Sequence, residues 1–104
     1  MFKTKWYESK FEKLTKAVQE RVIKFEQNLK LKPYDGKPLG YRFLREKKFN
    51  GNRLIFLVYD TNKVVFLVTI TDKKVQQQVI DLIKANLDMY KDMLEKTLNN
   101  IKSP

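Results

Sequence analysis

Apolar residues recur at helical spacing in the first third of the chain. They stand three or four positions apart, at Phe11, Leu14, Val18, Val22, Phe25 and Leu29. This stripe is typical of one amphipathic helix, or of two helices with a break near residues 15–17. Before it, the aromatic residues within Phe2–Tyr7 predict a short opening strand. Ser9 and Glu12 have the spacing of a capping box, so we expect the helical segment to begin there.

The middle of the chain alternates between turn-forming and apolar segments. Residues 31–40 hold two Pro and two Gly, which predicts a loop. Three strands are then expected, joined by turns at Asn50-Gly51 and residues 60–63, and they cover Tyr41–Arg45, Arg53–Tyr59 and Val64–Ile70. Because the last two are almost continuously apolar, we expect them in the centre of an antiparallel meander with both faces covered.

The last apolar stripe predicts one long helix over about residues 73–100, capped by Thr71 or Asp72. Its apolar positions are Val75, Val79, Ile83, Leu87, Tyr90, Leu94, Leu98 and Ile101. At 1.5 Å per residue such a helix is about 40 Å long, more than a small domain needs. Two outcomes are open for residues 89–104. They overhang and pair with a second copy or another protein, or they fold back over the same sheet.

Composition narrows the chemistry. The 104 residues fit a single α+β domain over residues 1–104. The chain has neither His nor Cys, which excludes Ser-His and Cys-His triads and thiolate metal sites. It has no apolar run long enough to span a membrane and no apolar leader, so we expect a cytoplasmic protein without a membrane partner. We also expect no metal and no cofactor.

The charge is strongly positive and unevenly placed. Lys and Arg number 22 against 12 acidic residues, a net charge of +10. Residues 31–53 alone hold seven Lys or Arg and two acidic residues. A basic stretch of this kind indicates a polyanionic partner such as a nucleic acid, although an acidic protein would be attracted by the same field.

The order of elements, together with the helical segment, the loop and the strands that follow it, resembles the RelE/ParE toxin superfamily over about residues 3–85. The resemblance is carried by residues 11–14, 18–22, 32–39, 53–60 and 63–68. It implies an α+β fold with an N-terminal helical segment, an antiparallel meander and a C-terminal helix. It also implies the toxin of a toxin–antitoxin pair, with a cognate antitoxin as partner. RelE-like members cut mRNA on the ribosome without a metal, whereas ParE-like members inhibit DNA gyrase.

The resemblance also suggests site residues. Arg53 opens a strand where RelE-like enzymes place an Arg on the scissile phosphate, and Lys74 stands where they carry a second Arg. Arg45 completes the expected catalytic set, and the expected RNA-binding residues are Arg42, Lys47, Lys48 and Lys73. We expect the head groups of Arg53 and Lys74 to converge on one phosphate-sized pocket. Cleavage through the RNA 2′-hydroxyl needs such cations to neutralise the phosphorane, and a Lys or Tyr to move protons.

Departures from the family pattern leave the function open. Ile80 stands where the best-studied enzymes carry a catalytic Tyr, and Lys74 replaces an Arg. Our first hypothesis is a RelE-like endoribonuclease (an mRNA interferase). The second is a ParE-like gyrase inhibitor or an inactive binding module of the same fold. The third is a basic RNA-binding scaffold that forms a homodimer through its C-terminal helix.

Overall fold

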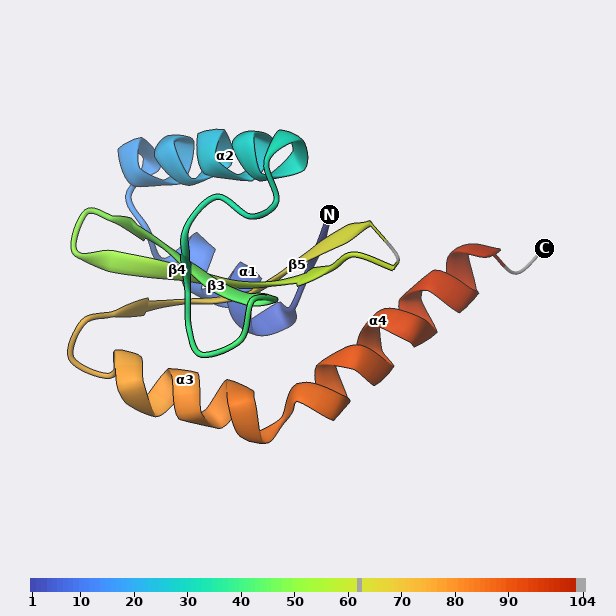
Figure 1. Ribbon diagram of the computed structural model, residues 1–104. Coiled ribbons are helices and arrows are strands. Elements are labelled where there is room, and N and C mark those ends of the chain that lie inside the picture. Colours follow the sequence, from blue (N-terminus) through green and yellow to red (C-terminus); the bar gives the residue numbers. More distant parts are fainter. Residues whose placement is uncertain (62, 103–104) are drawn as a thin grey trace.

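The computed structural model describes residues 1–61 and 63–102, with side chains through residue 100. These residues form a five-stranded sheet and four helices. Figure 1 shows how the helices lie around the sheet. In chain order the elements are β1 (Phe2–Lys3), α1 (Lys5–Glu12), α2 (Lys16–Leu31), β2 (Lys37–Pro38), β3 (Leu44–Phe49), β4 (Asn52–Tyr59), β5 (Val64–Asp72), α3 (Gln76–Ala85) and α4 (Leu87–Lys102). The α+β class is confirmed.

The sheet has the strand order β1-β5-β4-β3-β2. Strands β3, β4 and β5 form the expected antiparallel meander, and β1 pairs parallel to β5 through Phe2 and Phe66. The turn at Asn50-Gly51 is confirmed, because both residues have positive φ values of 45° and 77°. This turn fixes the register of the hairpin, in which Lys48 pairs with Arg53.

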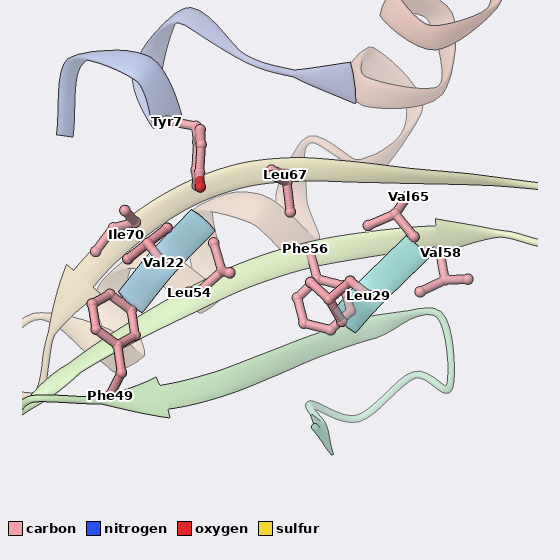
Figure 2. Close-up of a cluster of buried hydrophobic side chains, with 10 residues drawn as sticks. All are labelled: Tyr7, Val22, Leu29, Phe49, Leu54, Phe56, Val58, Val65, Leu67 and Ile70. Atoms are coloured by element: carbon pink, nitrogen blue, oxygen red, sulfur yellow. The ribbon is translucent and has the colours of Figure 1, made fainter. Parts of the chain in front are cut away.

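Helices cover both faces of the sheet. On the face we call the α1/α2 face, Val22 and Leu29 pack with Leu54 and Phe56 of β4, and Figure 2 shows Tyr7 pointing into the same cluster. On the opposite, α3/α4 face, residues of α3 and α4 pack over the alternate side chains of the strands, such as Ile55 and Leu57. The prediction that β4 and β5 are covered on both faces is therefore confirmed.

The N-terminal segment differs from the prediction in its capping. The strand ends at Lys3, and Thr4 caps α1 by accepting a hydrogen bond from the N–H of Tyr7 at 2.9 Å. Ser9 lies inside α1, so the expected capping box is wrong. The alternative with two helices is correct, because α1 ends at Glu12 and Thr15 caps α2.

The first long strand begins later than predicted. The N–H of Leu44 donates to the carbonyl of Tyr41 at 3.2 Å, which makes a turn of residues 41–44. Strand β3 therefore starts at Leu44, and Arg42 lies in the turn before it. Lys47 and Lys48 lie within the strand and not in the hairpin turn.

The predicted single C-terminal helix is two helices. The backbone breaks at Asn86, whose side-chain amide donates to the carbonyl of Leu82 at 2.8 Å. Asp72 accepts a hydrogen bond from the N–H of Val75, but Val75 is itself the N-cap residue of α3 and no side chain caps the helix, so the expected cap at Thr71 or Asp72 is wrong.

The break lets α4 turn back toward the sheet (Figure 1). Tyr90 and Leu94 are buried on the α3/α4 face, and Leu98 packs against the same cluster. Up to Leu98 the buried part of the apolar stripe therefore packs within the chain, while the side chain of Ile101 lies outside the described residues. No helix among the described residues is long and apolar enough to cross a membrane.

Candidate nucleic-acid interface

Arg53 occupies the second position of the central strand β4. It pairs with Lys48 of β3 on one side and Thr71 of β5 on the other. Side chains alternate between the faces of a strand, and the next residue, Leu54, points into the α1/α2 cluster. Arg53 therefore projects on the α3/α4 face, beside the side chains of Lys48 and Thr71.

The guanidinium of Arg53 is buried and forms no ion pair with the described carboxylates. The residue is 9% exposed, its Nη1 donates to the carbonyl of Asn52 at 3.3 Å, and its Nε has no hydrogen-bond partner among the described residues. The ion pairs in the described part of the chain involve other residues. A buried cation without an anionic partner is costly, and a bound anion would remove that cost.

Three lysines lie at the same end of the sheet as Arg53. Lys48 is exposed beside it, and Lys73 and Lys74 are exposed in the turn that follows β5. That turn is close to the start of β4, because its preceding residue, Asp72, pairs with Asn52. The chain thus brings the backbone of Lys74 to the Arg53 end, while the convergence of the two head groups on one pocket stays a prediction. These lysines have no acidic partner among the described residues.

Two residues near Arg53 were missed by the sequence analysis. Glu46 projects on the same face, diagonally from Arg53, and is 2% exposed. Its carboxylate accepts a short hydrogen bond from the side-chain amide of Gln76 in α3. The signal for Glu46 was available, because the register set by the Asn50-Gly51 turn places residues 46, 48 and 53 on one face.

Arg45 lies on the other face of the sheet. It pairs with Phe56, which belongs to the α1/α2 cluster. Its Nη2 donates to the carbonyl of Gly36 at 2.8 Å and its Nη1 to the carbonyl of Arg42 at 3.0 Å. The prediction that Arg45 joins Arg53 in one pocket is therefore corrected, since Arg45 is one position before Glu46 on β3 and points to the opposite face from Glu46, Lys48 and Arg53. Its contacts fasten the loop before β3.

Arg42 and Lys47 make contacts on the Arg45 side of the molecule. The guanidinium carbon of Arg42 lies 4.0 Å from the centre of the Tyr34 ring, and its Nη1 forms an ion pair with Asp60 at 3.1 Å. Lys47 pairs with Asp35 at 2.9 Å, and this contact lowers the pKa of that carboxyl. Both cations thus already have anionic partners, in contrast to Arg53 and Lys48.

Ile80 stands where the resemblance implies a catalytic Tyr, and no nearby tyrosine among the described residues takes over that role. Ile80 is buried in the α3/α4 cluster, where Tyr59 and Tyr90 also lie. Burial raises the pKa of Tyr59 to about 12 and also raises the pKa of Tyr90. These phenols therefore stay protonated near neutral pH. No group of three or more carboxylates that could hold a metal ion occurs among the described residues.

A cleft of about 700 Å³ lies at the far end of β4 from Arg53. Its lining comes from the loop before β3, the end of β4 and the first turns of α4, and includes Arg42, Phe43, Tyr59, Asp60 and Lys91. Three carboxylates, from Asp60, Asp88 and Glu95, line it as well. With acids and bases mixed on its walls, it has no clear preference for a phosphate, unlike the end at Arg53.

The fold is similar to that of solved structures of a bacterial toxin. The intact E. coli RelBE toxin–antitoxin complex contains a chain that superposes with a TM-score of 0.63 at 23% identity, over 68% of this chain and 92% of that chain. The chain has the RelE fold. The isolated E. coli RelE toxin aligns with a TM-score of 0.61 at 21% identity, over 79% of this chain and 95% of RelE.

A third RelE structure supports the same fold assignment. It is an arginine-to-alanine double mutant of E. coli RelE bound to a RelB peptide, with a TM-score of 0.63 and 21% identity, over 75% of this chain and 90% of that RelE. No family model matches the chain, and no curated protein sequence matches it. The match to RelE therefore rests on the arrangement of the helices and strands.

Proposed function

We propose that this chain is the toxin of a toxin–antitoxin pair and that it stops translation by cutting mRNA on the ribosome without a metal. The observation that carries the proposal is Arg53, a nine-tenths buried guanidinium without an acidic partner on the central strand of a RelE fold. Exposed Lys48, Lys73 and Lys74 around it supply the field that a polyanion needs. The RelE structures support the toxin assignment through their shared architecture.

The proposed reaction is a transfer within the RNA strand. The 2′-oxygen bonds to the adjacent phosphorus, the bond from phosphorus to the 5′-oxygen breaks, and a cyclic phosphate and a 5′-hydroxyl result. Arg53 would hold the oxygens that gain charge in the phosphorane, because its planar fork matches two phosphate oxygens. Lys48, Lys73 and Lys74 would hold the flanking phosphates and keep the strand in line for attack.

The proton of the 2′-hydroxyl needs an acceptor. Glu46 is the carboxylate that projects on the Arg53 face of β3, and Gln76 fixes its orientation. We assign it this task, since the buried phenols of Tyr59 and Tyr90 have raised pKa values and are poor bases. Lys74, at the rim, is our candidate to give a proton to the leaving 5′-oxygen.

An antitoxin is the partner that this proposal requires. RelE is bound to RelB in one of the similar structures and to a RelB peptide in another. By analogy we propose that a cognate antitoxin covers the basic end of this chain, and its neutralising segment would be acidic to match the net charge of +10.

A cell-free translation assay tests the proposal. Added protein should stop synthesis and leave mRNA cut within ribosome-bound codons. Arg53→Ala should lower the cleavage rate about 100- to 1,000-fold, as expected for removing a preorganised charge from a transition state. Lys10→Ala on α1, an exposed lysine of the other side, is the matched control and should act like the wild type. Intact mRNA at excess wild-type protein would refute the nuclease.

A gyrase inhibitor or inactive binding module of the same fold is the second candidate. The observation that favours it is Ile80, which is built into the apolar core where the resemblance implies a catalytic Tyr. A supercoiling assay separates the two candidates. Inhibition of gyrase together with intact mRNA would select the second, whereas cut mRNA and unaffected supercoiling would select the first.

A further inference from the structure

An aromatic ledge stands at the edge of the α3/α4 face, away from Arg53. The rings of Tyr41 and Phe43 stack with their centres 5.0 Å apart and 26° between their planes. Phe43 packs against the α3/α4 cluster and anchors the pair, whereas Tyr41 is 45% exposed. The ledge therefore offers a flat aromatic surface that is held in place from behind.

A lysine is held over the exposed ring of the ledge. The Nζ of Lys84 in α3 lies 5.9 Å from the centre of the Tyr41 ring. Gly40, with a φ of +92°, makes room for this amine, because a Cβ at that position would lie 2.8 Å from it. Lys84 forms no ion pair with the described carboxylates. Like Arg53, it is a cation that the fold positions and leaves without a counter-charge.

The ledge and Arg53 lie on the same side of the sheet. Leu44, just after the ledge, pairs with Leu57, and Leu57 and Arg53 both project on the α3/α4 face. Four residues of strand separate Leu57 from Arg53, which is about 13 Å. Helix α3 runs from Gln76, which contacts Glu46 near Arg53, to Lys84 beside the ledge. Arg53 and Lys84 therefore stand near opposite ends of α3, and the strand residues between them, Ile55 and Leu57, are buried.

We propose that Tyr41 is a stacking platform for an unpaired base of the RNA, and that Lys84 binds the neighbouring phosphate. This inference rests on the proposed function and adds a binding site to it. An exposed aromatic face next to an unpaired cation is the usual surface for single-stranded nucleic acid, because each nucleotide offers a π-face and a negative charge. A duplex is excluded, since its bases are stacked on one another and cannot reach the ring.

The test compares two uncleavable RNA hexamers, because the proposal separates base contacts from phosphate contacts. Both are 2′-O-methylated and fluorescein-labelled, and one lacks all its bases. Binding is measured by fluorescence anisotropy at low salt. The wild type should bind the base-bearing hexamer more tightly. Tyr41→Ala should weaken that binding about 5- to 100-fold and leave the binding of the abasic hexamer unchanged. Tyr41→Phe, which keeps the ring, should bind like the wild type.

Lys84→Ala tests the phosphate contact, and Arg53→Ala, used in the outcomes below, tests the separate site on β4. Lys84→Ala should weaken binding of both hexamers and reduce the slope of log affinity against log salt by about 0.7, the value for one phosphate contact on a single strand. Leu31→Ala, at an exposed apolar site elsewhere, is the matched control for Tyr41→Ala. Melting temperatures show that each variant is folded.

Each outcome decides the proposal. It is overturned if the wild type binds neither hexamer, if Tyr41→Ala weakens both equally, or if Tyr41→Phe fails like Tyr41→Ala. If Arg53→Ala weakens both hexamers and Tyr41→Ala weakens neither, the ledge fails while the Arg53 site stands. If Tyr41→Ala behaves as expected and Arg53→Ala changes nothing, the ledge stands and the phosphate site at Arg53 fails.

Discussion

The two faces of the sheet treat their cations differently. On the α1/α2 face, Lys3 pairs with Glu26 at 3.2 Å and Lys47 pairs with Asp35. Arg45 donates to two backbone carbonyls on that face, although its buried Nε has no partner among the described residues. On the α3/α4 face, Arg53 and Lys48 have no carboxylate partner among the described residues, although Arg53 is the more deeply buried of the two arginines on the sheet.

This contrast separates two uses of positive charge within one small domain. A cation with fixed partners stabilises the fold and has no capacity left for a ligand. A buried cation without partners costs stability and persists where a ligand repays the cost. The net charge alone does not make this distinction, because it counts both kinds equally.

Replacing Arg45 with methionine tests the first half of the comparison and should have the largest effect on stability. The change keeps the volume of the side chain but leaves the carbonyls of Gly36 and Arg42 without their charged donor. We expect the free energy of unfolding to fall by about 2–3 kcal/mol in urea titrations. Arg42→Met, which removes an exposed ion pair, should cost less than about 1 kcal/mol. Equal losses would contradict a special role for Arg45.

Arg53→Met tests the cation of the α3/α4 face, and we expect the free energy of unfolding to change in the opposite direction. Methionine removes a buried, unpaired guanidinium and retains its packing, so the free energy of unfolding should rise by about 1–2 kcal/mol. The measurement is the same urea titration, run beside the mRNA cleavage assay, in which the variant should be inactive. A large loss of stability would show that Arg53 serves the fold, and the contrast between the faces would disappear.

Alkaline pH probes the satisfied network on the α1/α2 face. Tyr7 donates to Glu26 at 2.5 Å, and burial, followed by this hydrogen bond, raises the pKa of Tyr7. Burial raises the pKa of Tyr59 from 10.0 to about 12 on the other face. The unfolded phenols ionise near pH 10, whereas the folded ones keep their protons. The free energy of unfolding should therefore be constant up to about pH 9 and fall as the pH rises through 10 toward 12.

Two variants test which tyrosine causes the loss of stability at alkaline pH. Tyr7→Phe should cost about 1.5 kcal/mol at neutral pH, because it removes a hydrogen bond to a carboxylate, and should make the fall above pH 10 shallower. Tyr59→Phe should make the fall shallower between pH 10 and 12, without a comparable cost at neutral pH. Urea titrations at stepped pH values measure both. An unchanged slope in both variants would contradict the assignment.

Two neighbouring lysines of β3 give the prediction with the smallest expected effect, and they test the difference between the faces within one strand. Lys47 and Lys48 differ in face, and Lys47 alone has an acidic partner in the described chain. Lys47→Ala should lower the free energy of unfolding by about 0.5 kcal/mol and leave RNA binding nearly unchanged. Lys48→Ala should leave stability unchanged and lower the salt dependence of RNA binding by about one phosphate contact. The reverse pattern would contradict the assignment of the faces.

Much of this fold can be predicted from the sequence. Strands β4 and β5 follow from their long apolar runs, and the tight turn follows from Asn50-Gly51, because these signals are local. The break between α3 and α4 does not follow, since the apolar spacing continues through Asn86. The amide of Asn86 bonds to the preceding turn of helix, and the burial of Tyr90 and Leu94 favours the new direction.

The site was predictable in part. Arg53 and the lysines at its end follow from the resemblance and from the meander. Predicting that Arg45 and Arg53 lie on opposite faces requires the register of the hairpin. A shift of that register by one residue would place them on the same face. The contact between Glu46 and Gln76 joins residues 30 positions apart, and the packing of α3 on the sheet creates it. No local pattern encodes such a contact.

The parallel pairing of β1 with β5 has a consequence for the point during synthesis at which the sheet is completed. The first strand pairs with a strand that is synthesised much later, since Phe2 lies opposite Phe66 and Lys3 opposite Leu67. Such distant pairings form late, because the intervening chain must first be closed into a loop. A nascent chain that ends before Phe66 lacks this closure. For the translation-blocking toxin proposed above, this order of folding would delay activity until most of the chain has been made.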